Sequence, residues 1–395
     1  MKYDFDKPTQ RRNTGSLKWD VMDSELPMWV ADMDFETAPA VKDAVVRIAE
    51  RGIYGYSIVP DEYFECIADF WKRRHGYRFA PSHMVYSNGI VAAISSMVRK
   101  LTTPAENVLI QPPVYNIFYN SILNNGRNII TNELIYEGGE YRMNFDDLEE
   151  KLKNPQTSLM ILCNPHNPVG KIWDRQTLAR AGELCKKYGV TVISDEIHCS
   201  ITKPGSSYVP FASASEICRD ISVSCVAASK SFNLAGLQSA CVIASNPVLR
   251  HRVWRGINTD EVGEPNVFAI EANIAAYRYG GEWLDSLNEY IYANRKFASD
   301  YILKNIPEVY PVKSDAGYLL WVDVSSYTDN SERFAKDLRR KNGLYVSDGV
   351  EYGKGGEGFI RINLATQRRN VEDGMARLKA YIDTLIMERD KNEKG

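Results

Sequence analysis

The central part of the chain alternates short apolar runs with amphipathic stretches. Between about residues 85 and 245 the apolar runs include NVLI, SLMILC, VTVIS, SVSCV and SACVIA. These runs are almost continuously hydrophobic, which is typical of strands buried on both faces, whereas TLARAGELCKKYG has the spacing of an amphipathic helix. The pattern predicts an α/β protein with a mostly parallel sheet between helices.

The pattern changes near residue 285, which predicts a second domain. The later segments are YLLWVDV, a helix SERFAKDLRRKNG, GFIRINLA and a closing helix VEDGMARLKAYIDTLIMER. A chain of 395 residues also exceeds the size at which one core keeps growing. We expect an N-terminal segment (1–45) packed against the small domain, a large domain (46–284) and a smaller α+β domain (285–395).

The charge, apolar content and cysteine spacing of the chain limit the classes of ligand that it is expected to bind. The net charge of −3 has both signs interspersed and gives no electrostatic reason to bind nucleic acid or a membrane. No apolar run approaches the roughly 20 residues of a membrane span, and MKYDFDKPTQRRN lacks the apolar core of a secretion signal. The seven cysteines show no metal-site spacing. We expect a cytoplasmic protein with reduced cysteines, no metal and a small-molecule ligand.

One lysine stands where a packed segment should not contain one. The run ISVSCVAAS is rich in β-branched and small residues and ends in Ser229, Lys230 and Ser231, before an Asn-Leu-Ala-Gly turn. Most lysines are solvated surface residues, which is the alternative interpretation. A desolvated lysine at a strand end loses its proton more easily and forms Schiff bases with carbonyl groups. The sequence therefore raises the hypothesis of a carbonyl cofactor at Lys230.

Polar residues follow two further strands. The strand SLMILC enters the loop NPHNPVG, which fixes Asn164 and Asn167 and is either a simple turn or an amide aimed at a ligand oxygen. The strand VTVIS ends in Asp195, Glu196 and His198. These carboxylates either cap a turn or, if buried, need a positive partner such as a protonated ring nitrogen.

Other candidates complete a constellation. Gly89 and Ile90 open an Ala-rich helix whose N-terminus suits a phosphate. Tyr115, with Tyr119 as its competitor, offers an aromatic face for a flat ring, and Arg361 lies within an apolar strand, where it either forms a structural ion pair or binds a carboxylate. Together these features predict a site for a planar, phosphorylated, aldehyde-bearing pyridine and an amino acid.

These motifs resemble those of the pyridoxal-phosphate enzymes of the aspartate-aminotransferase fold (fold type I), which implies a seven-stranded, mostly parallel sheet in the large domain. The chain is most similar to the MalY/PatB group of cystathionine β-lyases, also called carbon–sulfur lyases. The likeness rests on ELPMWVADMDFETAPAV, GIYGY, NPHNPVGKIW, SDEIHCS and AASKSFNLAGL, which occur in the family's order and span essentially the whole chain.

The resemblance implies a role for each site residue. Lys230 would be joined to pyridoxal 5′-phosphate, Asp195 would pair with the ring nitrogen, Asn167 would bind the ring hydroxyl oxygen with His198 nearby, and Tyr115 would stack on the ring. Gly89, Ile90 and Ser229 would hold the phosphate, and Arg361 the substrate α-carboxylate. Tyr56 would reach the phosphate of a neighbouring subunit, so the active protein would be a homodimer.

Two positions depart from the family pattern. Ser200 stands where an aspartate is expected in many relatives, and Gln238 where aminotransferases of this fold commonly carry a phosphate-binding arginine. The second departure leaves neutralisation of the phosphate more dependent on backbone N–H groups.

The implied reaction is β-elimination on a sulfur amino acid, with Lys230 as general base and with thiol, pyruvate and ammonia as products. An aminotransferase is the alternative, because lysine, aspartate and arginine serve both reactions. A regulator that binds the cofactor without turnover is a third hypothesis, from another class. The physiological substrate, whether cystathionine, cystine, cysteine or another S-conjugate, stays open.

Overall fold

A twisted seven-stranded sheet organises the larger part of the computed structural model, which describes residues 3–394. Its order is β2 (Met84–Ser87), β10 (Ala240–Ile243), β9 (Ser222–Val226), β8 (Thr191–Asp195), β7 (Thr157–Cys163), β3 (Asn107–Ile110) and β4 (Asn128–Thr131). All neighbours pair in parallel except β10, which is antiparallel to both β2 and β9. The predicted mostly parallel, seven-stranded α/β sheet is confirmed.

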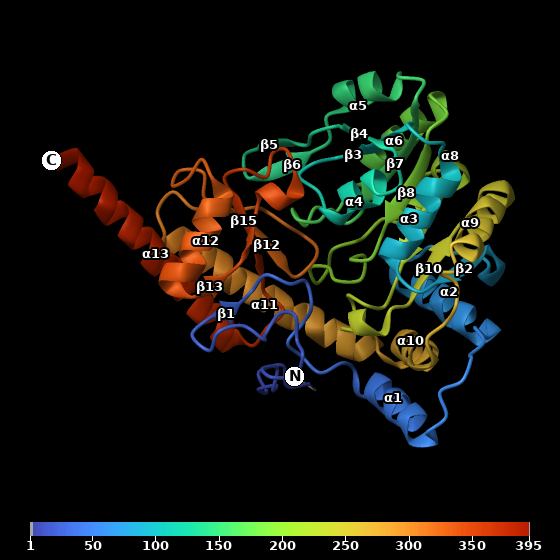
Figure 1. Cartoon of the computed structure of the whole chain (residues 1–395), viewed down its shortest axis with the longest axis horizontal. Coiled ribbons are helices and arrows are strands. Elements are labelled where there is room, and N and C mark those ends of the chain that lie inside the picture. The colour runs from blue at the N-terminus through green and yellow to red at the C-terminus, as the bar shows by residue number, and fades with distance from the viewer. Residues whose placement is uncertain (1–2, 395) are drawn as a thin grey trace.

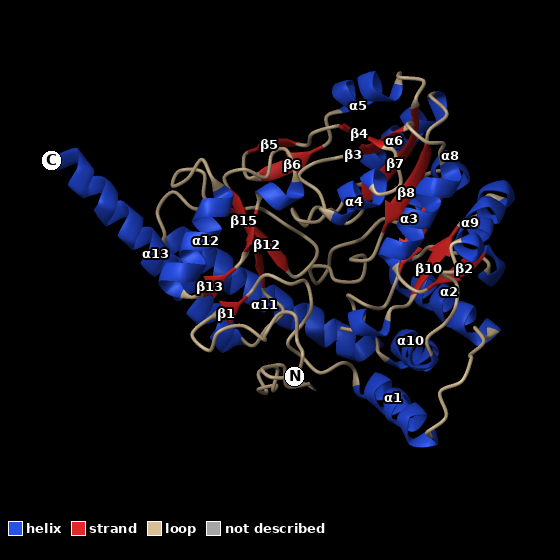
Figure 2. Ribbon diagram, in the orientation of Figure 1, coloured by secondary structure: helices blue, strands red, loops and turns tan. Residues whose placement is uncertain are grey.

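Helices cover both faces of this sheet (Figures 1 and 2). Strand β7 shows why: Leu159, Ile161 and Cys163 pack in one core, and Met160 and Leu162 pack in another. The first face is covered by α3 (Ile90–Leu101), α4 (Ile117–Leu123) and α9 (Pro247–Thr259), which contribute to the same core as Leu159. The opposite face is covered by α5 (Phe145–Leu152), α6 (Arg175–Lys187), α7 (Phe211–Ala214) and α8 (Glu216–Ile221), and further along by α2 (Asp61–His75) and α10 (Val267–Tyr279).

The C-terminal part builds a second, smaller sheet. Its order is β11 (Tyr310–Pro311), β12 (Leu319–Asp323), β15 (Phe359–Asn363) and β14 (Ser347–Asp348), all antiparallel. The helices α12 (Ser331–Asn342) and α13 (Arg368–Lys394) pack on it. The long helix α11 (Gly281–Asn305) runs between the two parts, with Leu284 in the large core and Ile302 in the small one (Figure 1).

The N-terminal segment touches both parts. Strand β1 (Leu26–Pro27) pairs in parallel with β13 (Leu344–Tyr345), and Leu26 and Met28 enter the small core. Helix α1 (Pro39–Arg51) instead packs against α10 in the large part. The domain limits at residues 45 and 284 remain a prediction, and the second of them falls within α11.

Short elements complete the chain. The hairpin β5 (Ile135–Glu137) and β6 (Glu140–Arg142) lies beside the small sheet, where Tyr136 contacts Phe359 edge to face. Three 3₁₀ turns occur at η1 (Pro81–His83), η2 (Ala235–Leu237) and η3 (Val350–Tyr352). The last of these brings side chains of the small part to the carboxyl ends of the large sheet.

Candidate active site

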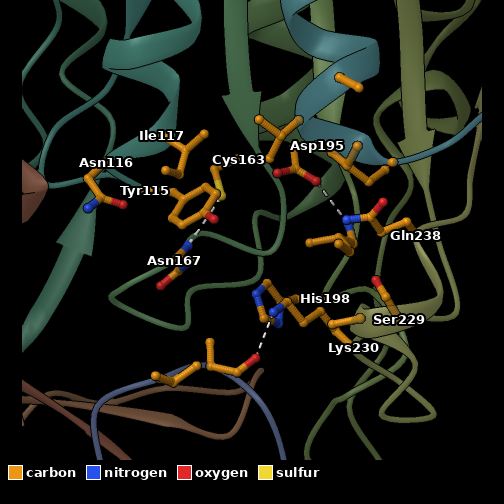
Figure 3. Close-up of a pocket in the computed structure, with 18 of the residues that line it drawn as sticks. Tyr115, Asn116, Ile117, Cys163, Asn167, Asp195, His198, Ser229, Lys230 and Gln238 are labelled. Carbon is orange, nitrogen blue, oxygen red and sulfur yellow. Dashed lines mark hydrogen bonds between the residues drawn. The ribbon is translucent and has the colours of Figure 1, made fainter. Parts of the chain in front are cut away.

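A cavity of about 780 Å³ lies at the carboxyl ends of the parallel strands, the edge at which ligands bind in open α/β sheets. It is lined by nine of the predicted site residues: Gly89, Ile90, Tyr115, Asn167, Asp195, His198, Ser229, Lys230 and Arg361. Figure 3 shows that Tyr115, Asn167, Asp195, His198 and Lys230 surround one common space. The structure thus brings together residues that are up to 272 positions apart in the chain, counted from Gly89 to Arg361.

Lys230 lies four residues beyond the end of β9, in the turn that leaves the strand. Its Nζ donates a hydrogen bond of 2.6 Å to the carbonyl oxygen of Ala31, and no carboxylate oxygen within the described residues lies within ion-pair distance of it. Burial, reinforced by the positive charge of Arg361, lowers the pKa of Lys230 to about 8. About a tenth of this amine is therefore neutral and nucleophilic at pH 7, far more than for a solvated lysine.

Asp195 ends β8 and is only 4% exposed. Its Oδ1 accepts the N–H of Ile197 at 3.2 Å. Burial raises the pKa of Asp195 to about 6, although this hydrogen bond and the charge of Lys230 act in the opposite direction. A buried carboxylate of this kind is stabilised by a cation in the cavity.

The neighbouring Glu196 has a different role. Its carboxylate accepts hydrogen bonds from the hydroxyl of Tyr208 at 2.6 Å, the hydroxyl of Ser224 at 3.0 Å and the N–H of Phe211 at 3.2 Å. Glu196 therefore cross-links the loop after β8 to β9 and α7, and it does not line the cavity. The structure thus separates the two adjacent carboxylates, a choice that the sequence left open.

The two asparagines of the NPHNPVG loop are also separated. Asn164 points away from the cavity and donates through Nδ2 to the carbonyl oxygen of Val209 at 3.0 Å. Asn167 lines the cavity, and its Oδ1 accepts a long hydrogen bond of 3.4 Å from Nη1 of Arg361. The amide nitrogen of Asn167 remains available to a ligand oxygen.

His198 is buried beside these groups. Its Nδ1 has no hydrogen-bond partner in the described part of the chain, and its ring meets that of Tyr318 edge to face. Burial lowers the pKa of His198 to about 3, so the ring is neutral. A neutral imidazole can share a hydrogen bond with a ligand without adding charge to the site.

Arg361 reaches the cavity from β15 of the small sheet and is 6% exposed. Nη2 donates to the carbonyl oxygen of Trp29 at 3.0 Å, and the guanidinium lies 4.9 Å from the ring centroid of Tyr352. Nε has no partner, and no carboxylate of residues 3–394 lies within 4.0 Å. A buried arginine without a counter-ion favours an anionic ligand, so the alternative of a structural ion pair is wrong.

The N-terminus of α3 also faces the cavity. Gly89 is its N-cap, Ile90 its first residue, and no side chain caps the free N–H groups. Ser229 and Gln238 line the same region. Among the described lining residues the cations are Lys230 and Arg361, so an anion at α3 depends on amide dipoles, hydroxyls and any group from a second chain.

The predicted aromatic residues fall into three environments. Tyr115 lines the cavity with its ring edge against Phe118, and burial raises its pKa to about 12. Tyr119 does not line it and donates to the carbonyl oxygen of Tyr352 at 3.3 Å. Tyr56 lies outside the cavity of its own chain and is fully exposed, in an extended segment between α1 and α2.

Several lining residues were not predicted from the sequence: Trp29, Cys163, Ser347, Glu351 and Tyr352. Trp29 lies within the ELPMWVAD motif, and Cys163 is the last residue of β7, so a strand-end search could have found the cysteine. Glu351 and Tyr352 belong to η3, which has no strand-end pattern and reaches the site only because the two sheets pack together.

The chemistry of this cavity fits the predicted cofactor. It combines an amine with a lowered pKa, a buried carboxylate without a cation, an available amide and an uncapped helix N-terminus. These groups match the aldehyde, ring nitrogen, ring hydroxyl and phosphate of pyridoxal phosphate.

Three further findings concern the described part of the chain. Its seven cysteines are all free and buried. No cluster of three or more histidine, cysteine, aspartate or glutamate side chains is placed to hold a metal ion in residues 3–394. The same residues include no helix with the length and apolar character of a membrane span.

Comparison with known proteins connects the site to a family. The family described as aminotransferase class I and II matches residues 26–378. The chain is 40% identical to cystathionine beta-lyase PatB of Bacillus subtilis, over 96% of this chain and 99% of that protein. It superimposes on cystalysin of Treponema denticola, which contains pyridoxal 5′-phosphate, with a TM-score of 0.94 and 30% identity over 98% and 100% of the two chains. It also superimposes on the pyridoxal-phosphate-bound carbon–sulfur lyase of Staphylococcus hominis with a TM-score of 0.90 and 33% identity, over 96% of this chain and 98% of that chain.

Proposed function

Because the chain belongs to the class I and II aminotransferase family and shares 40% of its residues with a cystathionine β-lyase over nearly its whole length, we propose that it is a pyridoxal-phosphate-dependent carbon–sulfur β-lyase. The joint position of Lys230, Asp195 and Arg361 in one cavity, each without an ionic partner within the described residues, supports pyridoxal-phosphate chemistry on an amino acid. Each of these groups would find its partner in the cofactor or in an amino-acid substrate. Because these three residues would also serve an aminotransferase, the observation that favours elimination is the 40% identity to a cystathionine β-lyase.

Different lining residues would contact different groups of the cofactor. Lys230 would hold it through the aldehyde carbon, Asp195 would pair with the ring nitrogen, and Asn167 would donate to the ring oxygen. Tyr115 would lie against the ring. His198 would stand next to the oxygen as a neutral group, because its pKa of about 3 keeps it uncharged.

When bound, the cofactor withdraws electrons from the substrate Cα and so makes its proton removable. Arg361 would bind the α-carboxylate through its guanidinium, whose Nε has no partner, and would thereby fix which bond at Cα faces Lys230. The amine of the substrate would replace Lys230 at the aldehyde carbon. The freed Nζ would then take the α-proton as general base, a task that a pKa of about 8 suits near neutral pH. Asp195 remains ionised beside the protonated ring nitrogen.

Loss of the α-proton permits cleavage of the Cβ–S bond. The sulfur leaves as a thiolate and is protonated to the thiol, and with one water the remaining three carbons and nitrogen become pyruvate and ammonia. L-Cystathionine would thus give homocysteine, pyruvate and ammonia. The buried, free cysteines support a reducing, cytoplasmic setting for this reaction.

A homodimer completes the proposed site. The cavity has no cation beyond Lys230 and Arg361 among its described lining residues, and both are assigned to other groups. The exposed segment at 52–58 presents Ile53, Tyr54, Tyr56 and Ile58 to solvent. Such an apolar strip is typical of an interface. We propose that it covers the cavity of a second chain and brings Tyr56 to its phosphate.

Mixing two inactive variants tests this sharing. In a mixed dimer of Lys230→Ala and Tyr56→Ala chains, one site combines both defects and the other has neither. Random mixing should therefore restore about a quarter of the wild-type activity, because half of the dimers are mixed and each has one intact site. If the mixed sample is no more active than either variant alone, each active site takes its residues from a single chain.

Product analysis tests the reaction itself. The holoenzyme is incubated with L-cystathionine and 2-oxoglutarate, and the products are identified by mass spectrometry. Homocysteine and pyruvate support the lyase. Glutamate together with a keto acid that retains the thioether would instead assign amino-group transfer.

A further inference from the structure

Glu351 is a charged residue of the cavity that the proposed reaction does not use. It lies in η3, between β14 and β15, and its backbone N–H donates to Oδ1 of Asp348 at 3.3 Å. The next residue, Tyr352, is buried against the guanidinium of Arg361. Glu351 is therefore held beside the carboxylate-binding arginine, but it remains exposed at the mouth of the cavity.

The carboxylate of Glu351 has no partner in the described chain. None of its oxygens accepts a hydrogen bond, and none lies within 4.0 Å of a lysine, arginine or histidine nitrogen in residues 3–394. Burial and the neighbouring Asp348 raise the pKa of Glu351, while Arg361 opposes them, which agrees with a position between these two groups. An exposed carboxylate at a cavity attracts a cationic ligand group and repels an anionic one by Coulomb interaction.

Glu351 is the one charged lining residue of the described chain that has no assignment in the proposed reaction. The four described charged lining residues of the cavity are Asp195, Lys230, Arg361 and Glu351. The first three are assigned to the cofactor and to the reacting end of the substrate. Arg361 is buried and Glu351 is exposed in the same cavity. A substrate with its α-carboxylate at Arg361 would therefore have Glu351 as the remaining charge for the part that extends beyond Cβ towards solvent.

We propose that Glu351 selects substrates by the charge of the group attached to sulfur. This inference rests on the proposed β-lyase function and adds a substrate class to it: cysteine S-conjugates that carry an ammonium group on the departing thiol. The same carboxylate repels conjugates whose departing group is only an anion, and it repels the distal carboxylate of dicarboxylic amino acids.

The size of the effect follows from Coulomb interaction at a partly exposed site. Such a charge changes binding of a cation or an anion by about threefold each, in opposite directions. The preference for a cationic over an anionic substrate should therefore change about tenfold when the charge is removed. It should also shrink at high salt, because exposed charges are screened.

Three amino acids of similar length test the proposal on the holoenzyme. They are S-(2-aminoethyl)-L-cysteine, S-propyl-L-cysteine and S-(carboxymethyl)-L-cysteine, which differ chiefly in the charge of the sulfur substituent. Thiol release should give kcat/KM in the order cationic, neutral, anionic. Glu351→Gln should reduce the cationic-to-anionic ratio about tenfold and leave the neutral substrate unchanged.

A binding measurement and a control separate the causes. Calorimetric titration of the same amino acids into Lys230→Ala protein, with and without Glu351→Gln, should show the same change in the ratio of Kd values. Glu183→Gln, which removes an exposed carboxylate of α6 away from the cavity, should change neither ratio.

The outcomes distinguish the two proposals. Turnover of all three substrates with an unchanged ratio in Glu351→Gln would overturn the role of Glu351 and leave the lyase intact. Failure of the wild-type protein to release thiol from these three substrates and from L-cystathionine would overturn the lyase. In that case the inference about Glu351 falls with it.

Discussion

Replacing Asp195 by asparagine should stabilise the cofactor-free protein while it removes activity. The carboxyl is 4% exposed, accepts one N–H from Ile197 and has no ion-pair partner in the described chain. Burial raises its pKa from 3.8 to about 6. Asparagine keeps an oxygen to accept the same N–H but carries no charge.

The magnitude follows from linkage between protonation and folding. The raised pKa means that the protonated form is favoured on folding: this contribution is fully present below about pH 4 and is lost as the pH rises through about 6. Each pKa unit corresponds to about 1.4 kcal/mol, so ionised Asp195 costs about 2 to 3 kcal/mol in the cofactor-free protein at pH 8. Asp195→Asn should recover most of this amount.

Chemical denaturation of the cofactor-free proteins measures the difference. The free energy of unfolding of Asp195→Asn relative to wild type should be near zero at the acidic end and rise to about 2 kcal/mol at pH 8. Asp174→Asn is the control, because hydrogen bonds from Thr177 lower the pKa of Asp174 and its neutralisation cannot stabilise. If the free energy of unfolding of Asp195→Asn equals that of wild type, or differs from it by the same amount at every pH, burial of an ionised Asp195 does not destabilise the cofactor-free protein. With cofactor, the same variant should lose activity by roughly a hundredfold or more.

Three other predictions test separate parts of the site. Arg361→Lys should reduce kcat/KM for amino acids by about a hundredfold, because a planar guanidinium that can bind a carboxylate with two hydrogen bonds is replaced by an ammonium group. Cofactor affinity, measured by absorbance titration, should stay within about twofold. A large loss of cofactor affinity would show that Arg361 contacts the cofactor and not the substrate carboxylate. In cofactor-free protein, Lys230 should react with an amine reagent with a half-maximal rate near pH 8, followed by peptide mass spectrometry, because burial lowers its pKa to about 8; a midpoint above pH 10 would contradict this. Gln238→Arg should tighten cofactor binding by adding a cation near the N-terminus of α3, which equilibrium dialysis can measure; unchanged or weaker binding would contradict a phosphate at this end of the cavity.

Most of the large sheet was predictable because its strands are buried on both faces. Apolar runs such as that of β7 need no knowledge of the rest of the fold, and their polar ends mark the edge where the cavity forms. Arg361 was predictable for a similar reason, since a charge within an apolar strand needs a partner. The two-residue strands β1 and β13 carry no readable period and form only through tertiary pairing.

The remaining features depend on packing between distant segments. Asp195 and Glu196 are both carboxylates at the same strand end, so the local sequence does not show which one faces the cavity. Hydrogen bonds from Tyr208 and Ser224, which are distant in the sequence, hold Glu196 in a structural position. Glu351 reaches the cavity because β15 and η3 dock on the large sheet, which no local pattern records. The contribution of Tyr56 depends on a second chain and stays a prediction.

The most direct test of the central claim is to follow pyruvate and free thiol together after adding L-cystathionine to purified holoenzyme without any keto acid. The proposed mechanism predicts one pyruvate for each thiol and no release of either by Lys230→Ala protein, in which the general base is missing. Absence of both products from the wild-type protein, accompanied by Lys230-dependent conversion of an added keto acid into an amino acid, would contradict the β-lyase and assign amino-group transfer.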